Sequence, residues 1–261
     1  MPAGQRAYLV STIAGLLRGR KHVAVGANLP IPAAAALLAR QMSGGAMRID
    51  MLGSRKFDSF AGLGGMFDCA CQGRFDGFFL SPGQIDGEGN INLVGVGAYP
   101  RLDVRWPGSH GSPLLYMMIP NIILFRDVHL KRVLVPKVDF ISAPGRSAPN
   151  VHRPGGPSAL VTSMGYFSFD RETGRFRLES IHRGHSAQDI ADNTGFGFDR
   201  AQPVRTTPLP DRRTLDLIGG QISNEIAEIY PQFATSLAAS ADALRSSLAN
   251  KAKGTEQAEH E

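Results

Sequence analysis

The order of apolar runs and glycine turns near the start of the chain constrains the fold more than any other feature. Val23 to Val25 is a short apolar run that ends at Gly26, which predicts a strand followed by a turn. We expect a helix through residues 33–40, because Pro30 and Pro32 suit a first helical turn. A strand, a glycine turn and a helix form the first unit of an α/β fold.

The later apolar runs predict further strands, which give way to hairpins. We expect strands over residues 49–52, 76–80, 119–125, 133–135, 138–142, 159–162, 166–170 and 176–178. Pro120 marks an edge or a strand start, and Gly174 closes a hairpin. We expect helices over residues 4–18, 186–193, 211–229 and 232–248.

This order predicts a three-layer α/β fold with a mostly parallel sheet and antiparallel additions. We expect a single domain over residues 1–249, because neither an internal repeat nor a convincing linker is visible. The polar segment 250–261 is expected to be disordered.

Charge and composition exclude several classes of partner. The formal net charge is +5, and the basic residues are spread along the chain rather than gathered on one element with aromatic residues. We therefore expect no nucleic acid, while a diffuse positive field suits an anionic small ligand. No apolar run is long enough to span a membrane and no signal-peptide pattern begins the chain, so we expect a soluble, cytoplasmic protein.

Metal and nucleotide chemistry are not indicated. Cys69 and Cys71 would share one face of a strand, but a structural zinc site needs four ligands and no second cluster accompanies them. We expect small, buried side chains there and no metal. No dinucleotide or ATP-binding glycine motif occurs in the chain.

The stretch from Leu80 to Ser112 has the composition of a binding rim, with glycine turns and small polar residues in place of a helical period. Exposed N–H groups over Gly108, Ser109 and Gly111 can form an oxyanion hole or contact a ligand carbonyl. Within this loop His110 is a possible acid or base, and the alternative is an imidazole that faces solvent or is merely structural. The loop lacks the Gly-x-Ser-x-Gly spacing of a serine hydrolase.

An ordered set of short motifs resembles the β-subunits of family I CoA-transferases, the glutaconate type in particular. The motifs are Val25-Gly26-Ala27-Asn28-Leu29-Pro30, Gln84-Ile85-Asp86, Gly89-Asn90-Ile91-Asn92, Gly108-Ser109-His110-Gly111, Asp139 to Gly145 and Asn193-Thr194-Gly195-Phe196. They follow the family's order over most of the chain. The resemblance implies the family's fold and a CoA thioester as ligand.

One departure changes the expected reaction. Where the family carries the glutamate that attacks the thioester, this chain carries Met51, and a thioether cannot form an acyl anhydride. Asp50 is adjacent, but neighbouring side chains of a strand point to opposite faces.

The combination of the family's motifs with Met51 in place of the glutamate resembles the β-subunits of steroid-degrading, ring-opening acyl-CoA hydrolases of actinobacteria. That resemblance implies a heterotetramer with an α-subunit that supplies the catalytic carboxylate. It implies no cofactor beyond the CoA of the substrate.

On this interpretation the chain contributes the Gly108 to Gly111 loop, an apolar wall at Met51, and Arg55 or Lys56 near the CoA phosphates. The alternatives are that Met51 belongs to the core and that Arg55 and Lys56 are ordinary surface charges. Two other functions stay open. One is a CoA-transferase that uses Asp50, and the other is a non-catalytic scaffold subunit.

Overall fold

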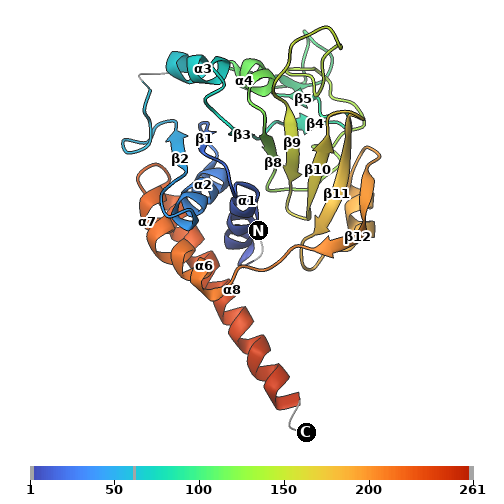
Figure 1. Ribbon diagram of the computed structural model, residues 1–261. Coiled ribbons are helices and arrows are strands. Elements are labelled where there is room, and N and C mark those ends of the chain that lie inside the picture. Colours follow the sequence, from blue (N-terminus) through green and yellow to red (C-terminus); the bar gives the residue numbers. More distant parts are fainter. Residues whose placement is uncertain (1–2, 61–62, 259–261) are drawn as a thin grey trace. The chain divides into compact units, whose positions relative to one another are not determined.

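The computed structural model describes residues 3–60 and 63–258 (Figure 1). The described residues form two compact units. The first unit contains residues 3–20, Ala27–Asp58 and the chain from Pro208 onward. The second contains Lys21–Gly26 and Ser59–Thr207. The chain therefore leaves the first unit after Asp58 and returns to it only at Pro208.

The first unit is mostly helical. Its elements are α1 (Gln5–Leu16), α2 (Pro30–Met42), β2 (Arg48–Met51), α6 (Arg212–Leu217), the π-helical turn Ile218–Ile222, α7 (Ser223–Ile226) and α8 (Pro231–Ala258). Helix α2 packs against α1 and α7, and its four consecutive alanines, Ala33 to Ala36, are all fully buried. Small side chains let neighbouring helices approach α2 closely.

Two expectations for the C-terminal region need correction. The helix expected over 211–229 is interrupted by the π-helical turn. Helix α8 runs to Ala258, so helix covers most of the segment 250–261 that was expected to be disordered. This segment is rich in alanine, lysine and glutamate, which favour helix. Residues 259–261 lie outside the described residues.

One mixed sheet forms the frame of the second unit. Its strands are β1 (His22–Val25), β3 (Gly77–Leu80), β8 (Ile122–Phe125), β9 (Pro157–Val161), β10 (Gly165–Asp170), β11 (Arg175–Ile181) and β12 (Asp199–Thr206). They lie in the order β12-β11-β10-β9-β8-β3-β1, and Figure 1 shows β8 to β12 side by side. The pairs β1/β3, β3/β8, β8/β9 and β11/β12 are parallel, while β10 is antiparallel to β9 and β11. The predicted α/β fold with a mostly parallel sheet and antiparallel additions is confirmed.

The burial of these strands explains why the sequence indicated them. Every residue of β3 and β8 is buried, so these central parallel strands are continuous apolar runs. Buried and more exposed residues alternate along β10 and β11, as in a sheet with one packed face. Gly174 turns this hairpin with a φ of 71°. Ser186 caps α5 (Ala187–Asn193) through a capping box, at the start of the helix expected over 186–193.

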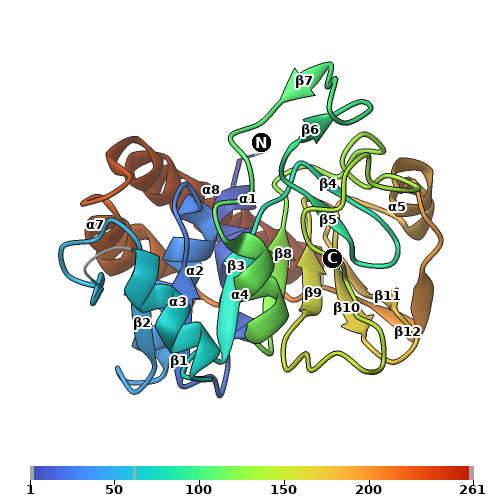
Figure 2. The same cartoon turned by 90° about the horizontal axis from the view of Figure 1, so that it is seen from above.

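Some expected strands are absent, and several short elements were missed. Residues 133–135 form only an isolated bridge, Leu134 with Ile85, and residues 138–142 form no strand, although Ala143 just after them bridges to Ile91. Both bridges are made to the short hairpin of β4 and β5 and not to the large sheet. The missed elements are β4 (Gln84–Ile85), β5 (Ile91–Asn92), β6 (Gly95–Val96), β7 (Val104–Arg105), α4 (Ser112–Met118) and β12. Figure 2 shows the hairpins β4–β5 and β6–β7 within the segment that was expected to be a rim.

The two cysteines lie on a helix and not on a strand. Helix α3 (Leu63–Cys71) carries both, and Cys69 is buried while Cys71 is exposed. Positions two apart on a helix do not share a face. The expectation that both side chains are buried is therefore wrong for Cys71.

Candidate functional site

The predicted site residues fall into two groups, one in each unit. Met51 and Arg55 lie in the first unit, at the end of β2 and in the turn that follows it. Gly108, Ser109, His110 and Gly111 lie in the second unit, in the loop before α4. The turn and the loop are each held by contacts within their own unit.

Met51 is a buried residue with a fixed backbone. It ends β2, and 1% of it is exposed. Its N–H donates to the carbonyl of Phe57 at 2.9 Å, and its carbonyl accepts from the N–H of Ser54 at 3.1 Å. Gly53 supplies the left-handed conformation that this turn needs, with a φ of 85°. A buried thioether at this point offers neither a nucleophile nor a proton.

Asp50 does not take the place of Met51. Its side chain is buried, and its Oδ2 lies 3.5 Å from Nε of Arg48. Residues two apart on a strand share a face, so Asp50 lies on the face of Arg48 and Met51 lies on the other. The carboxylate is therefore directed away from the position of the Met51 thioether.

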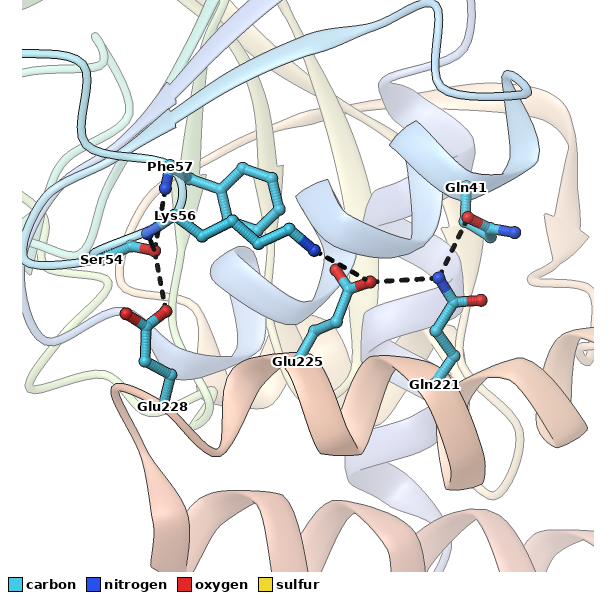
Figure 3. A network of polar contacts seen from close by, with 7 residues as sticks. All are labelled: Gln41, Ser54, Lys56, Phe57, Gln221, Glu225 and Glu228. Carbon is cyan, nitrogen blue, oxygen red and sulfur yellow. Dashed lines mark hydrogen bonds and ion pairs between the residues drawn. The ribbon is translucent and has the colours of Figure 1, made fainter.

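Two carboxylates hold the turn after Met51. Oδ2 of Asp58 accepts from the N–H of Gly53 at 3.1 Å, and Glu228 holds the next residues. Glu228, which follows α7, accepts from the hydroxyl of Ser54 at 3.0 Å (Figure 3). It also accepts from the N–H of Arg55 at 2.6 Å. The Ser54 hydroxyl oxygen also accepts from the N–H groups of Lys56 and Phe57, at 3.2 and 3.1 Å. The serine and Glu228 together satisfy consecutive backbone donors of the turn.

The charges of this turn are partly compensated within the first unit. Nζ of Lys56 lies 3.5 Å from Oε1 of Glu225 and 5.0 Å from the centre of the Phe57 ring. Gln221 donates to the same Glu225 oxygen at 3.1 Å and to Gln41 at 3.2 Å (Figure 3). The side chain of Arg55 is exposed. Because Glu225 and Glu228 both lie at this turn, a role for Arg55 with CoA phosphates stays a prediction.

The loop before α4 has an unusual backbone. Gly108, His110 and Gly111 all have positive φ angles, of 104°, 45° and 82°. A non-glycine residue in this region is uncommon, so the loop imposes its conformation on His110. The carbonyl of Ser109 accepts from the N–H of Ser112 at 2.7 Å, which closes the turn. His110 is exposed, so its imidazole is available to a partner molecule.

Packing explains why residue 111 of this loop is a glycine. A Cβ on Gly111 would lie 2.4 Å from Cζ of Phe67, so the backbone of the loop rests directly on α3. No side chain larger than hydrogen fits there without moving the phenyl ring.

Buried amide and carboxylate groups shape the rest of the rim. Asn92 is fully buried, and its Nδ2 donates to Oε1 of Gln84 at 2.8 Å and to the carbonyl of Gly95 at 2.7 Å. Its Oδ1 accepts from the N–H groups of Val94 and Gly95 at 2.9 and 3.3 Å. Oδ2 of Asp139 accepts from Nε2 of Gln84 at 3.1 Å. The hydrogen-bonding groups of these side chains are occupied by contacts that hold the hairpins together.

A second buried set lies beside the first. Asp86 accepts from the N–H of Glu88 at 3.1 Å and from the N–H and side-chain amide of Asn90, both at 3.0 Å. Oδ1 of Asn90 accepts from the N–H of Gly145 at 3.0 Å. The motif residues of the rim therefore act on the backbone and on one another.

Two buried histidines are neutral at neutral pH. The ring nitrogens of His129 lie 2.8 and 2.9 Å from the hydroxyls of Thr162 and Thr194, and Nδ1 of His182 lies 2.9 Å from the hydroxyl of Thr207. Burial lowers the pKa of each imidazole to about 4. These residues hold threonine hydroxyls inside the second unit.

Sequence reasoning missed Arg126, which lies at the carboxyl end of β8 and whose buried Nε has no hydrogen-bond partner among the described residues. It directly follows the four buried residues of β8. A charged residue at the end of a buried strand was the available signal.

Two further classes of site receive no support. Among the described residues, no group of His, Cys, Asp and Glu is arranged to hold a metal ion. Within the same part of the chain, no helix is long and apolar enough to cross a membrane.

No protein-family model matches the chain. Curated relatives do match it in part. The chain is 31% identical over 153 residues to the B subunit of 3-oxoadipate CoA-transferase of Pseudomonas knackmussii, which covers 56% of this chain and 58% of the relative. It is 31% identical over 151 residues to the B subunit of glutaconate CoA-transferase of Acidaminococcus fermentans, covering 55% and 56%.

A third relative is a subunit of a different kind of enzyme. The chain is 28% identical over 157 residues to the cholesterol ring-cleaving hydrolase IpdB subunit of Rhodococcus jostii, covering 59% of this chain and 61% of the relative. The resemblance to CoA-transferase B subunits is confirmed. In each of these three matches the chain spans less than two thirds of the relative.

Solved structures show the same fold. Rhodococcus jostii IpdAB matches with a TM-score of 0.73 and 24% identity, over 83% of this chain and 93% of that chain. Glutaconate CoA-transferase from Acidaminococcus fermentans matches with a TM-score of 0.71 over the same shares. The fold predicted from the sequence motifs is therefore shared with both.

Proposed function

We propose that this chain is the β-subunit of a heteromeric acyl-CoA hydrolase that opens a steroid-derived ring. The substrate is a cyclic ketone carried on a CoA thioester. Water adds to the ketone, the adjacent C–C bond breaks, the new acid keeps the oxygen of the water, and a proton is added to the carbon that leaves. The thioester itself is not cleaved.

The buried Met51 carries this proposal. The resemblance puts the transferase glutamate at Met51, and the structure has a buried thioether there. Without a carboxylate at this point, the acyl group cannot pass through a covalent adduct on the chain. A water nucleophile and a positioned base are the remaining route to a hydrolytic reaction.

The base is proposed to come from an α-subunit. Asp50 is buried beside Arg48, and the histidines His129 and His182 are buried against threonines. His110 is exposed, so it stays a candidate acid or base on this chain. We propose a heterotetramer in the cytoplasm, with no cofactor other than the CoA of the substrate, and with the Gly108 to Gly111 loop at the ligand.

A second candidate function is a CoA-transferase that moves CoA from an acyl-CoA to a free acid. It is favoured by the 31% identity to two CoA-transferase B subunits. A third candidate is a scaffold subunit without a catalytic role, which is favoured by the structural use of the rim's buried polar groups.

Water labelled with ¹⁸O separates these functions. The chain is purified with its α-subunit and incubated with a cyclic β-keto acyl-CoA, with and without a free acid acceptor. We expect one ¹⁸O atom in the new carboxylate of a ring-opened product that keeps its CoA. Movement of CoA to the acceptor without ring opening would establish the transferase instead. Unchanged kinetics with both His110→Ala and Arg55→Ala would favour the scaffold.

The variant Met51→Glu tests the placement of residue 51. If this residue faces the thioester, the new carboxylate should form a glutamyl-CoA adduct, seen by intact-protein mass spectrometry. Met51→Gln is the matched control, because it has the same size and no nucleophile. A complex that binds the thioester but forms no adduct with Met51→Glu would place Met51 in the core only.

A further inference from the structure

Arg126 occupies the carboxyl end of a central parallel strand. Its N–H donates to the carbonyl of Val161 at 2.9 Å, so its backbone continues the sheet beyond β8. On the other side β8 runs parallel to β3, with Leu124 opposite Leu80. In open α/β sheets, ligands bind at the carboxyl ends of the strands. The side chain of Arg126 therefore begins where this fold class places ligands.

The guanidinium of Arg126 is poorly satisfied. Its one side-chain hydrogen bond among the described residues joins Nη1 to the hydroxyl of Ser81, at 3.4 Å. Nε is buried and has no partner in the same part of the chain. A guanidinium has five N–H donors, and a buried donor without an acceptor is costly. The charges that act most on its pKa are those of Asp127, of opposite sign, and Arg132, of like sign, and both of these residues are exposed.

Arg153 shows how the same unit satisfies another half-buried arginine. Its Nε donates to the carbonyl of Gly155 at 3.0 Å, Nη1 to the hydroxyl of Ser147 at 3.3 Å, and Nη2 to the carbonyl of Tyr116 at 3.4 Å. Its guanidinium also lies 5.5 Å from the centre of the Tyr116 ring. Burial lowers the pKa of both arginines. The fold gives each of the three nitrogens of Arg153 a partner, whereas among the described residues Arg126 has a partner only at Nη1 and its Nε is buried without one.

The turn that begins at Ser81 is rigid and flanked by an indole. A Cβ on Gly83 would lie 2.1 Å from Cη2 of Trp106, so the indole packs directly on the backbone of this turn. The N–H of Trp106 donates to the carbonyl of Val94 at 2.9 Å, which fixes the start of the segment that leads to Gly108. Ser81 therefore presents its hydroxyl from a fixed backbone, next to an apolar surface.

We propose that Arg126 and Ser81 bind a carboxylate on the acyl part of the CoA thioester. A guanidinium binds a carboxylate through two parallel N–H···O bonds, and the two terminal nitrogens, which are not sealed off as Nε is, supply this pair. The hydroxyl of Ser81 can donate a third bond. This inference rests on the proposed function for the thioester and adds a second anionic group to its substrate.

The test compares two thioesters that differ only in this group. The affinities of glutaryl-CoA and pentanoyl-CoA for the purified complex are measured by calorimetry with the wild type and with Arg126→Gln. We expect Arg126→Gln to weaken glutaryl-CoA about 10- to 100-fold, as for a lost charge-assisted hydrogen bond, and to change pentanoyl-CoA by less than about twofold. Arg126→Lys should lie between, since it keeps the charge and loses the fork.

The matched control is Arg183→Gln, which removes an exposed arginine of the same unit. It should leave both affinities unchanged. Equal weakening of both thioesters by Arg126→Gln, or no effect on either, would overturn the carboxylate site while the proposed function stands. If the wild-type complex binds neither thioester, the proposed function fails and the carboxylate site fails with it. Thermal unfolding of each variant shows whether a lost affinity reflects a lost fold.

Discussion

Two connections follow buried strands in this protein, and they are held in opposite ways. The turn after β2, residues 52–57, is fixed by the carboxylates of Asp58 and Glu228, neither of which is buried. The loops after β3, residues 81–112, are fixed from inside by Gln84, Asn92 and Asp86, which are all buried.

The two regions should differ in how well they tolerate the loss of a hydrogen-bond partner. An exposed carboxylate competes with water for its donors, so its bonds contribute little to the free energy of unfolding. A buried amide has no water to replace a lost partner, so its removal leaves several groups unpaired. We therefore expect the rim to be rigid and intolerant of substitution, and the turn to be adjustable.

The largest effect is expected for Asn92→Ala. Four hydrogen bonds of the buried amide are lost, so the free energy of unfolding should fall by about 4 kcal/mol. Chemical denaturation measures this change. Asn150→Ala is the control, because Asn150 is exposed and its loss should cost less than about 0.5 kcal/mol. A loss below about 1 kcal/mol for Asn92→Ala would show that the buried network does not support the rim.

Acid is expected to lower the stability of the second unit, which contains His129 and His182. Their pKa values are about 4 in the folded chain, against 6.5 for an ordinary histidine. Below pH 6.5 the unfolded chain binds more protons than the folded chain, so stability is complete above pH 6.5 and is lost as the pH falls toward 4. Between pH 6.5 and about 5 the loss should be about 2 kcal/mol for each histidine.

Hydrogen exchange measured across this pH range locates the loss. Amides of β9 to β11 should lose protection, while those of α1 and α2 keep it. His129→Gln should reduce the pH dependence, and His152→Gln, at an exposed position, should leave it unchanged. A loss of protection that begins in α1 and α2 would reverse the comparison between the units.

The smallest effect is expected for Glu228→Ala. The free energy of unfolding should fall by less than about 1 kcal/mol, because the lost acceptor lies at the surface. The amide of Arg55 should nevertheless exchange faster, since its N–H loses its partner. Glu225→Ala is the matched control on the same segment, because Glu225 contacts side chains and not this amide. Unchanged exchange at Arg55 would show that the turn is held by other means.

The same contrast separates what the sequence predicted from what it did not. The apolar runs Phe78 to Leu80 and Ile122 to Phe125 indicated the central strands, because a strand buried on both faces must be apolar throughout. The strands of the rim, such as β4, span two residues each. They depend on bonds between positions far apart, such as Gln84 and Asp139, and no local pattern encodes these.

The candidate site divides in the same manner. Met51 was accessible to sequence reasoning, since its position follows from the motifs and its chemistry from the side chain. The burial of Asp50 beside Arg48, and the unused donors of Arg126, depend on what surrounds each side chain. Such surroundings become visible only when the chain is folded.

The interleaving of the two units sets an order on their completion during synthesis. The N–H of Ala7 on α1 donates to the hydroxyl of Ser240 on α8, and the side chain of Leu244 covers Gly4. The ribosome therefore releases all of Ser59–Thr207 before α1 can meet its C-terminal partner. The second unit can close while the first still exposes apolar helix faces, so we expect the nascent chain to be prone to aggregation until α8 emerges.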